Sequence, residues 1–169
     1  MSTITTLEEL FVEQLQYLYN AETQLIKALP AMAKAAHSPA LKDSFEAHFE
    51  QTKEHAARLE QIFEVLGKEA DGKKCQAMLG LIKEGKEMIS EKASSEVKDI
   101  GLIAAAQRVE HYEIAGYGCV RTYAKILGHK EAAKTLQTTL DEEAATDKKL
   151  TVIAEKLNLL PQEEAALKN

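Results

Sequence analysis

The sequence lacks tryptophan and contains few aromatic residues, prolines or cysteines. Aromatic residues make up 5% of the 169 positions, and there are three prolines and two cysteines. The cysteines, Cys75 and Cys119, are too few for a disulfide framework or a four-thiolate metal site, so we expect two reduced thiols. No apolar run approaches the ~20 residues that a membrane-spanning helix needs, and the N-terminus lacks the basic-then-apolar pattern of a signal peptide. The expected location is therefore the cytoplasm, with no membrane partner.

The charge balance argues against nucleic acid as a partner. Acidic residues number 27 and lysine plus arginine 21, which gives a formal net charge of −6, and the basic residues form no dense cluster. A surface that binds a run of phosphates needs such a cluster. Apolar residues make up 45% of the sequence and charged residues 28%. A mixture rich in alanine, leucine, glutamate and lysine is typical of an all-helical protein, and this length is sufficient for one domain with a core.

Hydrophobic periodicity predicts four long helices within a single domain, residues 1–169. It places them at about residues 5–36, 39–67, 99–128 and 130–158, with a shorter amphipathic helix inside a crossover at 68–98. Thr5 or Thr6 can begin the first helix with a Thr-x-x-Glu capping box. Ser38 and Pro39 suit the N-cap and the first position of the second helix, and Pro161 is expected to end the fourth.

A weak internal repeat supports this arrangement. A shift of 91 positions places Glu22 on Glu113 and Thr52 on Glu143 without a gap, and the apolar stripes stay in phase. Two helical hairpins joined by a long crossover form a four-helix bundle. We therefore predict an all-α, antiparallel four-helix bundle in which Glu22 and Glu113 meet near the axis.

Three glutamates occupy positions where an apolar stripe would carry leucine. They are Glu22, Glu113 and Glu143, and at about 100° per residue each carboxylate lies near the middle of its stripe. A buried lone carboxylate costs several kcal/mol unless it is paired, protonated or bound to a metal. Because three such residues converge, we expect one metal centre to account for all of them.

Four further candidates lie at compatible heights along the bundle. Glu110 and Asp147 each lie one turn from a central glutamate, and His48 and His55 face the interior from the second helix. No lysine or arginine lies near the stripe centre in the middle of the four helices, so partners for salt bridges are scarce there. Carboxylates with a little imidazole suit iron or manganese, because oxygen ligands neutralise and bridge two such ions. We therefore predict a site for Fe or Mn, with two ions if the ligand set is complete and one ion if it is not.

Each candidate ligand also has an alternative interpretation. A central glutamate could instead be hydrogen-bonded to water or to one of three tyrosines, Tyr19, Tyr112 and Tyr117. Glu110 and Asp147 lie further from the stripe centre and could be partly solvated. The two histidines could be core or boundary residues with only a structural role. Burial and the positions of hydrogen-bond partners distinguish these alternatives.

The third predicted helix carries a family resemblance. Its segment Val109-Glu110-His111-Tyr112-Glu113-Ile114-Ala115-Gly116-Tyr117-Gly118 resembles the signature of the YciF-type stress proteins, which belong to the ferritin-like superfamily. Residues 19–25, 48–52 and 140–147 are similar to the other helices of that family. The resemblance implies a ferritin-like four-helix bundle, a bacterial cytoplasmic location, frequent homodimers and an association with stress.

The ligand pattern departs from that of the wider superfamily. Ferritin-like di-iron proteins generally use one glutamate on each of two helices and Glu-x-x-His on the other two. Glu22 and Glu113 match the single glutamates. The expected pairs become Thr52-x-x-His55 and Glu143-x-x-Thr146, so each pair has lost one member. The number of metal ions therefore stays open between one and two.

The resemblance and the residues together lead to a functional hypothesis. Glu22 and Glu113 would bridge or cap the ions, and the coordination would be completed by Glu110, Glu143, Asp147 and His55. Glu110 resembles an extra glutamate of rubrerythrins, and Asp147 is a candidate for the missing histidine. The expected chemistry is metal redox with dioxygen or hydrogen peroxide. The alternative is a non-enzymatic dimeric bundle whose carboxylates are structural or bind metal without turnover. Iron storage is a third possibility, which would require a shell of many subunits.

Overall fold

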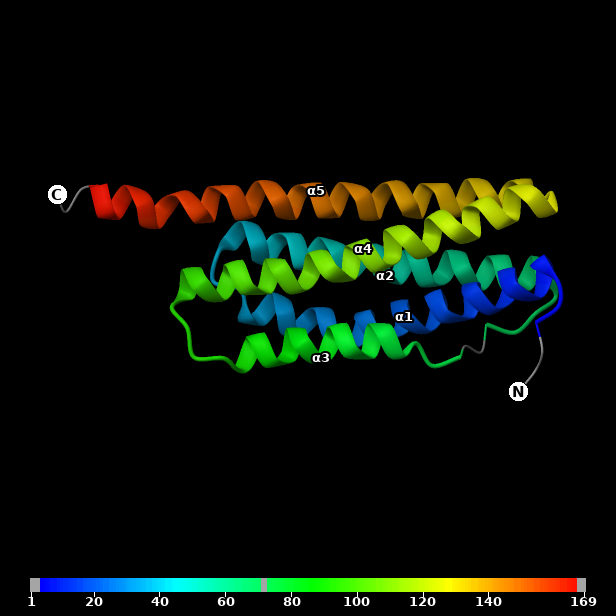
Figure 1. Cartoon of the computed structure of the whole chain (residues 1–169), viewed down its shortest axis with the longest axis horizontal. Coiled ribbons are helices and arrows are strands. Elements are labelled where there is room, and N and C mark those ends of the chain that lie inside the picture. Colours follow the sequence, from blue (N-terminus) through cyan, green and yellow to red (C-terminus); the bar gives the residue numbers. More distant parts are fainter. Residues whose placement is uncertain (1–3, 71–72, 167–169) are drawn as a thin grey trace.

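The protein consists of five α-helices in a computed structural model that describes residues 4–70 and 73–166 (Figure 1). The helices are α1 (Leu7–Ala35), α2 (Pro39–Leu66), α3 (Gln76–Ser90), α4 (Ser95–Leu127) and α5 (Lys130–Ala166). No strand occurs among the described residues, which confirms the predicted all-α fold. Within the same ranges, no helix combines the length and the apolar character needed to cross a membrane.

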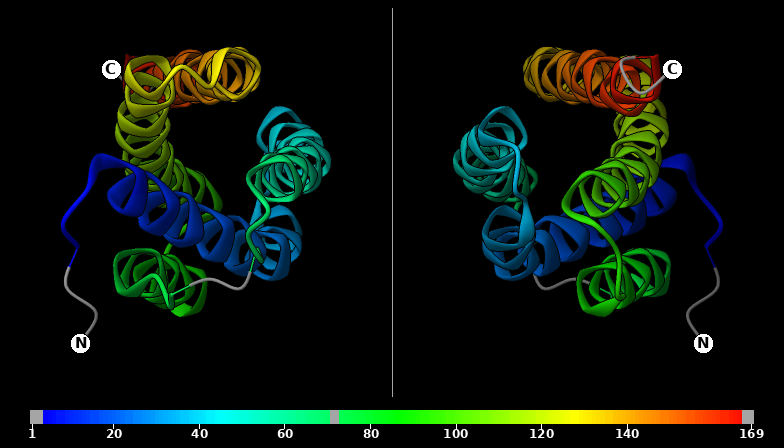
Figure 2. Two further views of the ribbon diagram at one scale, coloured as in Figure 1. Left: turned by 90° about the vertical axis from the view of Figure 1, so that its right-hand side faces the viewer. Right: turned by 90° about the vertical axis from the view of Figure 1, so that its left-hand side faces the viewer.

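The four long helices form the predicted antiparallel bundle. Helix α1 packs against α2 and α4, and α5 packs against α4 and α2, so the four close into a ring. The crossover from α2 to α4 returns along the length of the bundle, and α4 therefore begins at the same end as α2 (Figure 1). Helix α3 lies within that crossover, outside the ring, and covers α1 and α4 (Figure 2).

The helix starts follow from local capping, with one contribution from a distant helix. Thr6 and Glu9 form the predicted capping box at the start of α1. Ser38 and Pro39 hold the predicted positions at the start of α2, but the Ser38 side chain makes no cap hydrogen bond. Asp99 of α4 instead accepts the backbone N–H groups of His37 and Ser38, at 2.9 Å and 2.6 Å. A buried carboxylate from the second hairpin thus stabilises the N-terminus of α2.

Two predicted helix ends differ from the structure. Helix α4 begins at Ser95 rather than near Asp99, because the Ser94 side chain accepts a hydrogen bond from the Val97 backbone and caps the helix earlier. Helix α5 does not end at 158 and continues past Pro161 to Ala166. A proline removes one backbone hydrogen bond and costs about 3 kcal/mol in a helix interior, but it does not forbid helix on either side. The glutamine, glutamates and alanines after Pro161 favour continuation, and Pro30 lies inside α1 in the same way.

A layer of buried polar residues separates two apolar clusters along the bundle. One cluster contains Leu25, Phe45, Leu102 and Leu150, and the other contains Phe11, Leu59, Val120 and Leu136, all of them buried. In each long helix, the buried glutamate or histidine positions fall between residues of the two clusters. We call this region the polar layer and define it by its buried titratable members, Glu22, His48, His55, Glu110, Glu113 and Glu143.

Replacing either of two nearby glycines of α4 by alanine is expected to change the free energy of unfolding, in opposite directions at the two positions. A Cβ at Gly116 would lie 2.7 Å from Cδ2 of Leu18, a side chain that is only 2% exposed, whereas a Cβ at Gly118 meets nothing within 4 Å. We predict that Gly118→Ala raises the free energy of unfolding by about 0.5–1 kcal/mol, because glycine is a poor helix former. Gly116→Ala is expected to lower it by about 1 kcal/mol through overpacking of α4 against α1. Urea denaturation of both variants checks this; an equal gain in both would contradict the close approach.

Candidate metal centre

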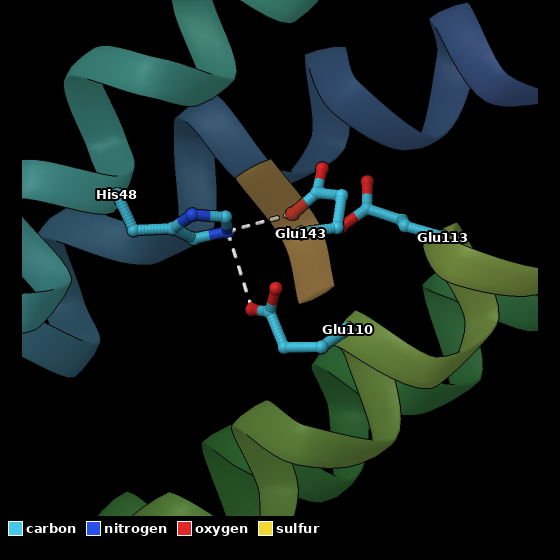
Figure 3. Close-up of side chains that lie close together, drawn as sticks. All are labelled: His48, Glu110, Glu113 and Glu143. Atoms are coloured by element: carbon cyan, nitrogen blue, oxygen red, sulfur yellow. Dashed lines mark ion pairs between the residues drawn. The ribbon is translucent and has the colours of Figure 1, made fainter. Parts of the chain in front are cut away.

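The structure brings six of the seven predicted ligands together in the polar layer. His48, Glu110, Glu113 and Glu143 offer ligand atoms that lie within 4.8 Å of one another, and we call these four residues the His48 group. Glu22, His55 and Glu143 form a second set under the same limit, the His55 group. Figure 3 shows the side chains of the His48 group pointing toward one another from three helices. All six residues are buried.

Glu143 is the one residue that both groups share among the described part of the chain. Its Oε1 lies 3.0 Å from Nδ1 of His55, and its Oε2 lies 3.9 Å from Nε2 of His48. The sequence hypothesis had Glu22 and Glu113 bridge or cap the ions; the structure places Glu22 in the His55 group and Glu113 in the His48 group. A carboxylate with one oxygen toward each group has the geometry of a bridging ligand.

Asp147 is the predicted ligand that the structure leaves outside both groups. Its carboxylate accepts a hydrogen bond from Nε2 of Gln107 at 3.1 Å and lies 3.3 Å from Nε2 of His111. Its side chain is 20% exposed, so it lies at the edge of the bundle. The partly solvated alternative therefore describes Asp147 well. Glu110, for which the same alternative was open, is fully enclosed in the polar layer.

Two threonines stand where the superfamily pattern has a glutamate and a histidine, and both contact His48. The hydroxyl of Thr52 donates to the backbone carbonyl of His48 at 2.8 Å. The hydroxyl of Thr146 lies 3.5 Å from Nδ1 of His48. With Nδ1 facing Thr146, Nε2 faces Glu110 at 3.2 Å. His48 lies one helical turn before Thr52, where the Glu-x-x-His pair of the superfamily would begin. Its imidazole reaches the polar layer from that earlier turn.

Many polar atoms in the layer are buried without a hydrogen-bond partner among the described residues. Both carboxylate oxygens of Glu113 and of Glu143 are in this state, as is one oxygen each of Glu22 and Glu110. The inward-facing nitrogens of the two histidines approach carboxylates but not in hydrogen-bonding alignment. Buried polar atoms are nearly always satisfied in native proteins. These atoms therefore point to a partner that is not part of the chain.

Tyrosines account for only one of these carboxylates. The hydroxyl of Tyr117 donates a hydrogen bond to Oε1 of Glu22. Tyr19 donates instead to Glu60, and the hydroxyl of Tyr112 contacts Sγ of Cys75 at 3.0 Å. The alternative of tyrosine-bonded glutamates is thus realised at one oxygen of Glu22 and does not extend to Glu113 or Glu143. Both cysteines are free, as predicted.

The sequence hypothesis missed two residues that fix the orientation of His55. Oε2 of Glu142 lies 2.8 Å from Nε2 of His55, and Arg58 donates to both carboxylate oxygens of Glu142. This contact turns Nδ1 of His55 toward Glu22 and Glu143. A histidine whose outer nitrogen is held by a carboxylate is the usual arrangement for a metal ligand. The adjacent Glu142-Glu143 pair was the signal available in the sequence.

Burial and mutual repulsion raise the pKa of most of these carboxylates and so favour their protonated form. Burial, together with the nearby Glu143, raises the pKa of Glu22 from 4.5 to about 8. Burial raises the pKa of Glu110 and of Glu113 well above the ordinary value, and neighbouring glutamates add to the effect. The pKa of Glu143 is lowered, because His55 and His48 outweigh its burial. Burial opposes the charge of His55, but Glu143, Glu22 and Glu142 raise its pKa to about 9. The direction of these pKa shifts favours protons as the counterbalance to the carboxylates when no metal is bound.

The donor set fits iron or manganese. Four buried carboxylates and two buried imidazoles converge, and the guanidinium of Arg58 is engaged by Glu142. Oxygen-rich sites with some imidazole are typical of these metals, whereas thiolates would be expected for a structural zinc site. In the absence of metal, protons must take the place of the positive ions.

The metal-free protein is expected to lose stability as the pH rises from about 5 to 9. The pKa of Glu22 is about 8 in the folded chain against 4.5 when unfolded, so its stabilising proton is fully present below pH 4.5 and lost through pH 8. His55, with a pKa raised from 6.5 to about 9, contributes in the same direction. Chemical denaturation of the metal-free protein across this range measures the slope. Glu22→Gln should flatten it, while Glu64→Gln, an exposed control on α2, should not; a slope unchanged by Glu22→Gln would contradict the assignment.

Comparisons with known proteins identify the family and the fold of the chain. Residues 6–162 match the family described as a domain of unknown function, DUF892. The protein YciF of Escherichia coli (strain K12) is 46% identical over 153 residues, which cover 88% of this chain and 90% of YciF. The crystal structure of the E. coli stress protein YciF superimposes with a TM-score of 0.88 at 44% identity, covering 91% of this chain and 98% of that one. The structure of YcfI from Rhodopseudomonas palustris gives 0.85 at 42% identity, with 88% and 94% covered. The chain therefore belongs to the DUF892 family and is a homologue of the stress protein YciF, as the resemblance of its third long helix predicted.

Proposed function

We propose that the bundle binds two iron or manganese ions in the polar layer and uses them for redox chemistry with dioxygen or hydrogen peroxide. The observation that carries this proposal is the set of buried, unpartnered carboxylate oxygens in two groups that share Glu143. Four ionised carboxylates would balance the charge of two divalent cations, which offsets the cost of burying them. The E. coli relative is described as a stress protein.

The residues divide into three roles in this proposal. One ion would be held by His48, Glu110 and Glu113. The other ion would be held by Glu22 and His55, and Glu143 would contact both ions. Two ferrous ions would supply two electrons, which with two protons reduce one dioxygen to hydrogen peroxide, or one hydrogen peroxide to two water molecules.

Neighbouring residues would prepare the site for binding. Glu142 holds the ring of His55 in its ligating orientation, and Tyr117 fixes the carboxylate of Glu22. Glu110 and Glu113, whose pKa values are raised by burial, would release their protons as cations enter, so that affinity increases with pH. A cytoplasmic location and a homodimer stay predictions from the family resemblance, and the two free cysteines agree with a reducing compartment.

The second candidate function is a non-enzymatic bundle whose carboxylates are structural or bind metal without turnover. The specific observation in its favour is that protons alone can balance the layer. The raised pKa of Glu22 and the ion pair between His55 and Glu143 leave little uncompensated charge. Such a core is tolerable without metal, although its unpartnered oxygens still cost free energy.

Metal is expected to stabilise the folded protein. Adding Fe(II) anaerobically, or Mn(II), should raise the melting temperature, because a ligand that binds only the folded state at 100 times its Kd contributes about 2.7 kcal/mol. The double variant Glu22→Gln with Glu113→Gln removes one ligand from each group and should abolish the rise. Glu64→Gln with Glu155→Gln, two exposed glutamates on α2 and α5, is the matched control and should retain it. A rise that persists in the first double variant would show that the ligands are misassigned.

Turnover distinguishes the two candidate functions. We expect the metal-loaded protein to oxidise Fe(II) faster than buffer when dioxygen or peroxide is mixed in, as followed by stopped-flow absorbance. Elemental analysis before and after loading gives the metal content of the same sample. Stoichiometric metal without oxidation above buffer would favour binding without turnover. Metal far below one ion per chain after loading would favour a purely structural core.

A further inference from the structure

A cavity adjoins the polar layer on the side that α3 covers. It is an apolar cavity of about 40 Å³ that is lined by residues of all five helices, most of them from α1, α3 and α4. Its walls include Leu25, Met32, Ile82, Gly85, Ala105 and Val109. The lining also includes His48 and Glu110 of the polar layer, and Lys86 and Ile89 of α3, which are at least partly exposed. The cavity thus leads from the surface beside α3 to the His48 group.

The size of the cavity limits what it can hold. A single water needs about 10–15 Å³ of such space, so this cavity accommodates a molecule of two or three non-hydrogen atoms. Apolar cavities of this kind stay dry and bind xenon or small hydrocarbons. Water or hydrogen peroxide in the apolar stretch would give up hydrogen bonds, at a cost of more than 1 kcal/mol for each lost bond. A small apolar molecule loses nothing there.

We propose that this cavity admits dioxygen to the His48 group, and that α3 serves as the wall that forms it. This inference rests on the proposed function and deepens it, because it names dioxygen as the oxidant that uses this route. Hydrogen peroxide, which requires hydrogen bonds, is expected to arrive at the polar edge beside Glu142 and Arg58, whose side chains are 26% and 22% exposed.

Gly85 is the position at which the route can be closed. It is buried where α3 crosses α1 and α4, and an added Cβ would lie 3.6 Å from Sδ of Met32 and 4.0 Å from Cβ of Ala105. Those distances are ordinary contacts, so alanine fits, whereas the further carbons of leucine must occupy the cavity. Gly80 lies on the same helix, is exposed, and meets nothing within 4 Å, which makes it the matched control. Neither glycine contacts the metal-ligand candidates.

Xenon binding to the metal-free protein tests the cavity without any catalysis. A crystal of the metal-free protein under xenon pressure should show an anomalous peak between Gly85 and Glu110, and the Gly80→Leu variant should show the same peak. In Gly85→Leu the peak should disappear, and in Gly85→Ala it should weaken. The milder Gly85→Ala keeps the test valid if leucine prevents folding. A wild-type crystal without xenon at this position would overturn the inference.

Oxidation kinetics then test the choice of oxidant. In the Fe(II)-loaded protein, Gly85→Leu should slow oxidation by dioxygen about tenfold or more, a barrier increase of ~1.4 kcal/mol, while Gly80→Leu leaves the rate unchanged. Oxidation by anaerobic hydrogen peroxide should be the same in both variants. The proposal would be overturned if Gly85→Leu slowed oxidation equally with both oxidants, or if it slowed oxidation with neither of them. If the protein binds xenon but takes up no metal, the proposed function is wrong and the cavity is still supported. If the metal-loaded protein turns over with dioxygen but binds no xenon, the proposed function is supported and the dioxygen route through this cavity is wrong.

Discussion

The cost of taking four carboxylates out of water governs the rest of this structure. Glu22, Glu110, Glu113 and Glu143 lie between two apolar clusters, where an isolated charge would be strongly destabilising. The chain supplies two imidazoles and no buried lysine in the layer, so full ionisation of all four carboxylates has no internal balance. Either protons or cations must make up the difference. This single requirement links the raised pKa values, the unpartnered oxygens and the proposed metal site.

The internal repeat explains both the symmetry of the site and its departure from symmetry. Glu22 and Glu113 are repeat mates, and each belongs to one ligand group. Glu143 has Thr52 as its mate, so only one of the two hairpins contributes a carboxylate at the shared position. Thr52 instead supports His48 through the hydroxyl that it donates to the backbone. The imidazole of His48 therefore reaches the layer from one turn before Thr52. The His48 group contains four candidate ligands, and the His55 group contains three.

Helix α3 distinguishes the two long sides of the bundle. It covers α1 and α4 and encloses the apolar cavity that ends at His48 and Glu110. On the opposite side, near α2 and α5, the layer meets a polar edge formed by Glu142 and Arg58. An apolar side and a polar side on one metal centre would expose it to molecules of different polarity. The long crossover, which a four-helix bundle needs only as a connection, also lines the cavity beside His48 and Glu110.

The sequence alone determined the fold class, the central glutamates and the capping box of α1, because a stripe position in a long helix almost fixes which way a side chain faces. The sequence could not show that His48 would join a ligand group and that Asp147 would not. Both were ligand candidates at compatible heights along the bundle, and only the packing of α5 against α4 turned Asp147 to Gln107 at the edge while His48 was enclosed. Nor could it show that Glu142 and Arg58 orient His55, since those contacts join α2 to α5 across the bundle. Helix periodicity is a local property, whereas the rotation and height at which helices pack depend on all their side chains together, and these decide which candidate residues the structure brings together.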